Sequence, residues 1–221
     1  MNGPNPDLLR AEFLGVTVRH EEVRHDREAT ALLFAGAGER YELTRMEWSP
    51  EGGATMSGSN GAELVLRPAQ TASATVTGLG FHEGLERVTG LLDEALAGHA
   101  HERLWIDDIT LVAIWDCEEE DAARRHLSDE VLGLDRERAD LLGGEDDDAA
   151  HGLRVWRRLG EGSLDIAVEP MHADTSKIYV RLVYSEDDAV PDTAAVAERA
   201  EAVNAYLHGP LAAFVRARAR R

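Results

Sequence analysis

The sequence predicts an α+β fold built from two similar halves, each an antiparallel sheet followed by a packing helix. Apolar and polar residues alternate in several short runs, which is typical of strands with one buried face. These runs follow the same order in both halves: a long apolar strand, shorter strands joined by turns, and then a helix. We interpret this recurrence as a helix-grip-like internal duplication.

The second half shows the clearest strands. Between Gly162 and Tyr184, apolar residues alternate with other residues in two runs. Pro170 ends the first run because proline cannot donate to a ladder, and the polar residues 172–176 are typical of a turn. Residues 153–159 alternate as well. We therefore expect a three-stranded antiparallel meander.

The first half repeats this order with weaker signals. Residues 11–19 are rich in β-prone side chains, and strands are predicted at 41–48, 62–67 and 73–77. Asn60-Gly61 lies between two of them and is a strong signal for a tight turn. This half therefore also predicts a strand followed by a meander.

Each meander is followed by a predicted helix. In residues 81–98 the apolar side chains fall on one face, and Gly98 suits the end of the helix. The last helix should begin after Asp192, a good N-cap, and should kink or break at Gly209-Pro210. A further helix is expected at 116–132, where acidic residues in the first turn would complement the helix dipole.

The predicted organisation has three parts. Residues 1–10 form a flexible N-terminus, residues 11–100 the first sheet-plus-helix half, and residues 101–221 the second half. The two halves are expected to form one compact unit. With 43% hydrophobic residues, the chain should bury a core without a cofactor.

Charge and composition restrict the partners. The formal net charge is −19, which repels nucleic-acid phosphates and anionic lipids, so neither nucleic acid nor a membrane is expected as a partner. No run approaches the roughly 18 apolar residues that cross a bilayer. Cys117 is the lone cysteine, and the start of the chain lacks a secretory signal. We therefore expect a cytoplasmic protein.

Four residues are candidate metal ligands. His99 and His101 are two residues apart, a spacing that lets two side chains on a strand share a metal, and Asp107 and Asp108 lie inside the long apolar strand 103–115. Adjacent strand residues point to opposite faces, so a bulge or an exposed edge explains the aspartates more simply. A metal-assisted hydrolase that uses these residues is kept as an alternative.

Other motifs are interpreted structurally. His20 and His25 are five residues apart, one too many for the helical zinc-protease motif. The glycines within residues 35–39 are expected in a hairpin turn, and the acidic residues 143–148 in a solvated loop. Acidic neighbours should raise the pKa of the Cys117 thiol and make it a poor nucleophile.

The order of elements resembles an uncharacterised, sporadically distributed bacterial family of similar length with two strand-rich halves. Residues 80–96 running into the strand at Leu104, the strand beginning at Leu164, and the closing segment 203–214 carry the resemblance. Where that family usually has an Arg-Ile-Gly-Leu-Arg-Tyr-like strand, this chain has Leu-Trp-Ile-Asp-Asp-Ile at 104–109. The resemblance implies no activity and no functional residue.

The sequence favours a non-catalytic protein that acts through contacts with another protein. This hypothesis depends on the duplication, the high charge and the lack of a catalytic motif. The alternatives are the metal-assisted hydrolase and a helix-grip protein that holds a small apolar ligand between its sheet and last helix. An exposed edge strand in either half also offers a route to a homo-oligomer.

Overall fold

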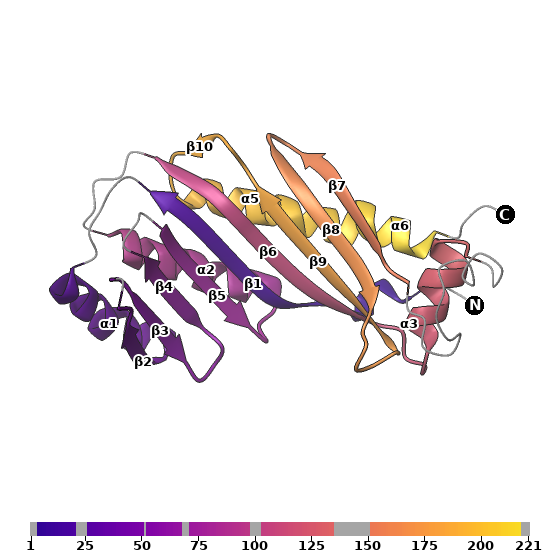
Figure 1. The fold of residues 1–221 in the computed structure, drawn as a ribbon, viewed down its shortest axis with the longest axis horizontal. Coiled ribbons are helices and arrows are strands. Elements are labelled where there is room, and N and C mark those ends of the chain that lie inside the picture. Colours follow the sequence, from indigo (N-terminus) through magenta and orange to yellow (C-terminus); the bar gives the residue numbers. More distant parts are fainter. Residues whose placement is uncertain are drawn as a thin grey trace.

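A computed structural model describes residues 4–20, 26–50, 52–67, 71–97, 103–134 and 151–217. The fold is α+β, and one large antiparallel sheet runs through the whole molecule (Figure 1). The strands lie in the order β2-β3-β4-β5-β1-β6-β9-β8-β7, and the short β10 pairs with β6. The strands are β1 (Leu9–His20), β2 (Leu43–Trp48), β3 (Ala54–Gly58), β4 (Glu63–Arg67), β5 (Thr71–Thr77), β6 (Leu104–Asp116), β7 (Leu153–Leu159), β8 (Gly162–Pro170), β9 (Lys177–Ser185) and β10 (Ala189–Val190).

The predicted strands are present, and Asn60-Gly61 lies in a tight turn between β3 and β4, but β3 itself was not predicted. The expectation that each half has a sheet of its own is wrong. The long strands β1 and β6 pair antiparallel along almost their whole length and join both halves into one sheet. This pairing satisfies two backbone edges that separate sheets would leave exposed.

The helices lie between groups of strands and at the C-terminal end of the described chain. Those with α-helical geometry are α1 (Arg27–Tyr41), α2 (Phe81–Leu96), α3 (Ala122–Arg125), α5 (Thr193–Tyr206) and α6 (Ala212–Arg216). The π-helical segment η2 (His126–Val131) continues α3, and η3 (Leu207–Leu211) joins α5 to α6. Pro210 lies inside η3, so the chain passes the predicted kink in a widened turn and remains helical.

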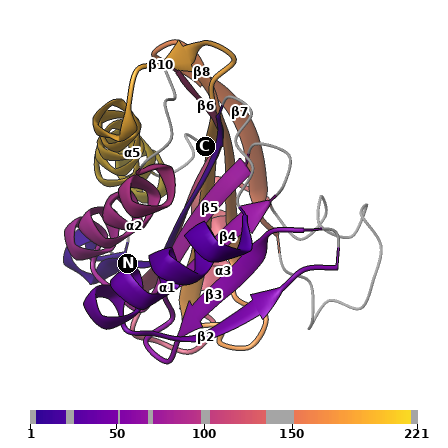
Figure 2. The same cartoon turned by 90° about the vertical axis from the view of Figure 1, so that its left-hand side faces the viewer.

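The helices α2 and α5 lie side by side on one face of the sheet (Figure 2). Contacts of α2 with β1 and β5, and of α5 with β6, make this the helix-covered face. Alternate strand residues such as Thr75, Val112 and Arg181 point to the opposite face and remain half-buried. We call this opposite side the open face.

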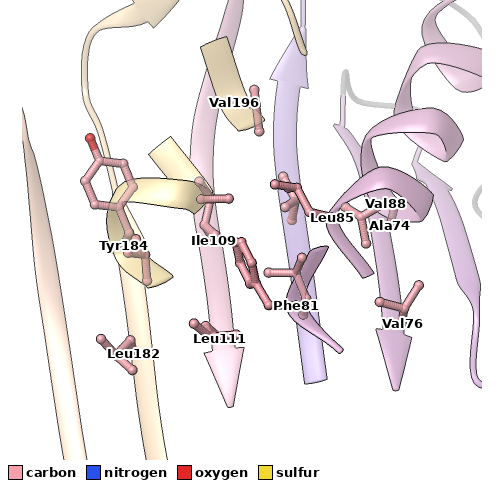
Figure 3. Packing of buried hydrophobic residues seen from close by; sticks show 14 of the residues in the cluster. Ala74, Val76, Phe81, Leu85, Val88, Ile109, Leu111, Leu182, Tyr184 and Val196 are labelled. Atoms are coloured by element: carbon pink, nitrogen blue, oxygen red, sulfur yellow. The ribbon is translucent and has the colours of Figure 1, made fainter. Parts of the chain in front are cut away.

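The core fills the space between the sheet and α2 and α5. Leu111 and Leu182 from neighbouring strands, Phe81 and Leu85 from α2, and Val196 from α5 all lie in one cluster (Figure 3). The predicted apolar face of the helix after residue 80 is buried there. Each fully buried aliphatic or aromatic side chain of this kind contributes about 1.5–3 kcal/mol by leaving water.

Two predicted segments differ from the structure. Residues 35–39, expected in a hairpin turn, lie inside α1, whose N-cap Asp26 accepts a hydrogen bond from the Ala29 amide at 2.8 Å. An alanine-rich segment and a good N-cap here outweigh the helix cost of the two glycines, about 1 kcal/mol each. The helix expected from residue 116 begins only at Ala122. Glu118 and Asp121 have φ angles of 66° and 60°, which interrupt any helix before it.

The first residues are more ordered than predicted. Pro6–Leu8 form a 3₁₀ turn, and β1 already begins at Leu9. The indole Nε1 of the buried Trp115 donates a hydrogen bond to the Asn5 carbonyl at 2.7 Å. A buried indole N–H needs an acceptor, and the Asn5 carbonyl supplies it. This hydrogen bond attaches residues 5–10 to the sheet.

No helix in the described ranges is long and apolar enough to cross a membrane.

Candidate functional site

The two candidate aspartates lie at the predicted bulge of β6. Thr17 on β1 pairs with Asp108, and the next residue, Val18, pairs with Ile106, so Asp107 is the extra residue. Arg19 Nε donates to Asp107 Oδ1 at 3.2 Å, and the Thr110 hydroxyl donates to Asp108 Oδ1 at 3.1 Å. The bulge is confirmed, and each carboxylate already has a different partner.

The candidate histidines His99 and His101 lie outside the described residues. Within the described ranges, no three His, Cys, Asp or Glu side chains lie close enough to hold a metal ion. His20 is buried at the end of β1, so the first histidine of the protease-like spacing stands on a strand. His25 and the acidic residues 143–148 also lie outside the described part of the chain.

Cys117 follows β6 and is half-buried. Burial, with a smaller contribution from the Asp116 carboxylate, raises the pKa of its thiol to about 12. We predict that the folded protein reacts with a disulfide reagent at pH 8 about 10³-fold more slowly than free cysteine, because so little thiolate is present. Unfolding in urea should restore the ordinary rate. The reaction is followed by absorbance. If the folded protein reacts as fast as free cysteine, the raised pKa of the Cys117 thiol is contradicted.

An apolar groove lies between β7 and the C-terminal helical segment. It has a volume of about 340 Å³ and lies on the helix-covered side of the sheet. Its apolar lining comes from two strands and from α5, η3 and α6: Leu153, Val155, Ile166, Tyr206, Leu211 and Phe214. This volume is at the lower end of the volumes of small-molecule binding sites, and such sites are also lined mainly by apolar side chains.

Two side chains on the groove show that it is incompletely filled. Phe214 on α6 is 50% exposed, although Leu211 one turn earlier is buried. Val155 on the strand side is only half-buried, whereas Ile166 beside it on β8 is buried. Apolar surface in a concavity gains free energy when another apolar group covers it.

Different helices pack at the two ends of the sheet. In the first half, α1 packs against the outer strands β2 and β3 and against α2. In the second half, α3 packs against β8 and β9. Among the described elements, no helix therefore covers β7 as α1 covers β2. The strands β2 and β7 lie at opposite ends of the sheet (Figure 1).

Strand β7 forms one edge of the sheet and pairs with β8 through a two-residue turn. Gly160 has a φ of 58°, the left-handed conformation that a tight hairpin turn requires at this position. Trp156 in the middle of β7 is 66% exposed, and the Arg154 guanidinium lies over its ring at 5.0 Å. An exposed tryptophan on a sheet edge is a common feature of binding surfaces.

The charge of β7 contrasts with that of the chain. The strand has three arginines and no acidic residue, in a protein of net charge −19. Arg154 donates two hydrogen bonds to Asp165, which lower the pKa of that carboxyl group. Arg157 and Arg158 are exposed, line the groove and form no ion pair with any residue that the structure describes. This edge is therefore locally basic.

The fold and the groove together define an α+β chain in which α2 and α5 cover one face of an antiparallel sheet, with an apolar groove that has a basic rim at one edge. No model of a known protein family matches the chain, and a search of curated proteins finds no match either.

The sequence predicted the strand β7, and the ligand-binding alternative expected an apolar space between the sheet and the last helix, but the residues that line the groove were not identified. The exposed Trp156 between arginines on a predicted strand was the available signal, because a buried strand would not place charges on both of its faces. The contribution of Tyr206 and Phe214 was not predictable, because apolar residues in a helix most often pack in the core. Their position beside β7 depends on how α5 and α6 lie along the sheet.

Proposed function

We propose that this chain is a non-catalytic binding protein that receives apolar side chains of another protein in the groove between β7 and α6. The observation that carries the proposal is the groove itself, with the half-exposed Phe214 on one wall and Leu153 and Val155 on the other. A concave apolar centre with a charged rim is the usual arrangement of an interface hot spot. The exposed Arg157, which is on the groove side of β7, supplies that rim.

A site-specific crosslink tests this proposal. A photoreactive phenylalanine analogue at Phe214 should give one discrete covalent adduct in the native cell. The same analogue at Leu32, which is 68% exposed on α1 at the other end of the sheet, is the matched control and should not give that adduct. Truncation of Phe214 to alanine should weaken the purified complex by about 30-fold, as expected for a central aromatic anchor. Identical adducts at both positions, or none at Phe214, would contradict the proposal.

A second candidate function is supported by the same groove. A small apolar ligand held between the sheet and the last helix would contact Ile166 and Leu211, and a carboxylate on it would reach Arg157. Native mass spectrometry of the gently purified protein tests this. A bound small molecule that is lost in a Leu211→Gln variant would favour the ligand, whereas a ligand-free mass would favour the protein partner.

The internal duplication is also a proposal. Each half places the last strand of its meander beside its first strand, and α2 and α5 lie on the same face of the sheet. The two helices contact each other, and the Thr193 hydroxyl donates to the Asp93 carboxylate between them. In this interpretation, the groove arose where the second copy kept a shorter first helix.

A further inference from the structure

We propose that the partner binds by adding an acidic strand to the free edge of β7. This inference rests on the proposed function and specifies its chemistry: a segment of alternating acidic and apolar residues in another protein. Strand addition to an exposed edge gives affinity through backbone hydrogen bonds and specificity through alternate side chains.

The backbone of β7 is suited to this mode. Leu159 and Gly162 flank the two-residue turn and therefore form a hydrogen-bonded pair. Hydrogen-bonded pairs recur at every second residue of an antiparallel strand, so Arg157 and Val155 also bond to β8. The amides of Trp156 and Arg158 alternate with these and therefore point away from the sheet. Within the described residues, no strand pairs with this outer edge.

The side chains specify the sign of the partner. An added strand would place alternate residues beside Arg154, Trp156 and Arg158 on the open face, and the others over the groove. Acidic residues on the first side would meet the exposed Arg158, and apolar residues on the second would cover Phe214. Opposite charges on neighbouring strands stabilise a sheet.

A second copy of this chain is a poor occupant of the same edge. Two β7 strands that pair antiparallel about Trp156 would place Arg154 directly opposite Arg158 twice. Like charges directly opposite each other destabilise a sheet. The other edge strand, β2, lacks this preference, because Arg45 forms an ion pair with Glu47 on the same strand.

The test uses a short capped peptide of alternating glutamate and valine, with a lysine-valine peptide as its control. The glutamate peptide should bind the full chain, and the lysine peptide should bind at least about tenfold more weakly. The charge-reversed variant Arg158→Glu should invert this order. Since Arg158 is exposed, the variant should keep its fold, which circular dichroism would verify.

Hydrogen exchange of the ¹⁵N-labelled protein supplies the second readout. The peptide should protect the amides of Trp156 and Arg158 and leave those of β2 unchanged. Binding of the glutamate peptide without this protection would overturn strand addition and leave groove binding, and hence the proposed function, in place. Equal binding of both peptides, or binding of neither, would also overturn the inference. If the free protein forms a dimer in which the same amides are already protected, the occupant of this edge is a second copy of the chain and not an acidic strand of another protein.

Discussion

Replacing Leu111 by alanine is expected to lower the free energy of unfolding by about 2–5 kcal/mol, the range for removing a buried leucine side chain. Leu111 is fully buried on β6 in the middle of the sheet, and its side chain points to the helix-covered face (Figure 3). The loss combines the transfer free energy of the removed atoms with the cavity that the rigid sheet cannot fill. Urea unfolding followed by tryptophan fluorescence measures it.

The neighbouring residue provides the matched control. Val112 points to the open face and is only half-buried, so Val112→Ala should cost less than about 1 kcal/mol. Equal losses at the two positions would mean that both faces of the sheet are covered, and the one-sided core described above would be wrong.

The second large effect is expected at Glu186, which ties the sheet to α5. Its carboxylate is 3% exposed and accepts hydrogen bonds from the Tyr184 hydroxyl at 2.7 Å and from Arg199 Nε at 2.8 Å. Glu186→Gln should lower the free energy of unfolding at pH 7 by about 1–3 kcal/mol, as for other hydrogen bonds to a buried charge. The lower part of this range is favoured because Arg199 is 32% exposed and its charge is screened by water.

The pH dependence of this effect has a definite sign. The hydrogen bond from Arg199 lowers the pKa of the Glu186 carboxyl group below its ordinary value, although burial opposes this shift. The folded protein therefore binds this proton less readily than the unfolded chain, and the stabilisation is fully present above the unfolded pKa of about 4.3. It is lost as the pH falls through the lowered pKa of the folded state. The difference between wild type and Glu186→Gln should thus shrink on acidification.

Glu198 is the control for this experiment, because it is exposed on the same helix. Glu198→Gln should change the free energy of unfolding by less than about 0.5 kcal/mol. A loss at Glu186 no larger than this, or a difference that grows towards low pH, would show that the carboxylate does not hold α5 to the sheet.

Much of the secondary structure was predictable because it depends on local patterns. The alternation in 153–159 and 162–184, the Asn60-Gly61 turn and the Asp192 N-cap each have a local physical cause, and each appears as predicted. The bulge at Asp107 was predictable because two charged residues interrupt an apolar strand. The helix α1 was missed because its glycines and lack of a clear apolar face gave no helical period, and its contacts with β2 and α2 supply the missing stability.

The candidate site was less predictable than the strands. The aspartates and histidines attracted attention because of residue type and spacing, but neighbouring side chains decide whether such residues converge. Asp107 pairs with Arg19, which is 88 residues away in the sequence. The groove required knowing that β7 is an edge strand and that Phe214 lies beside it. Both facts concern segments far apart in the chain.

The sequence by itself determined where most strands and the two long sheet-packing helices form, which residues they bury, and that the surface is strongly acidic. These properties follow from side-chain periodicity, capping and charge, which act over a few residues. Only the tertiary structure decided that the halves share one sheet through β1 and β6, that α2 and α5 pack on the same face, and that, among the described strands, β7 forms a basic edge beside an apolar groove. The order of the strands, and whether a helix or strand packs against an edge, depend on contacts between segments far apart in the chain. The free energies of these contacts cannot be read from a local sequence pattern.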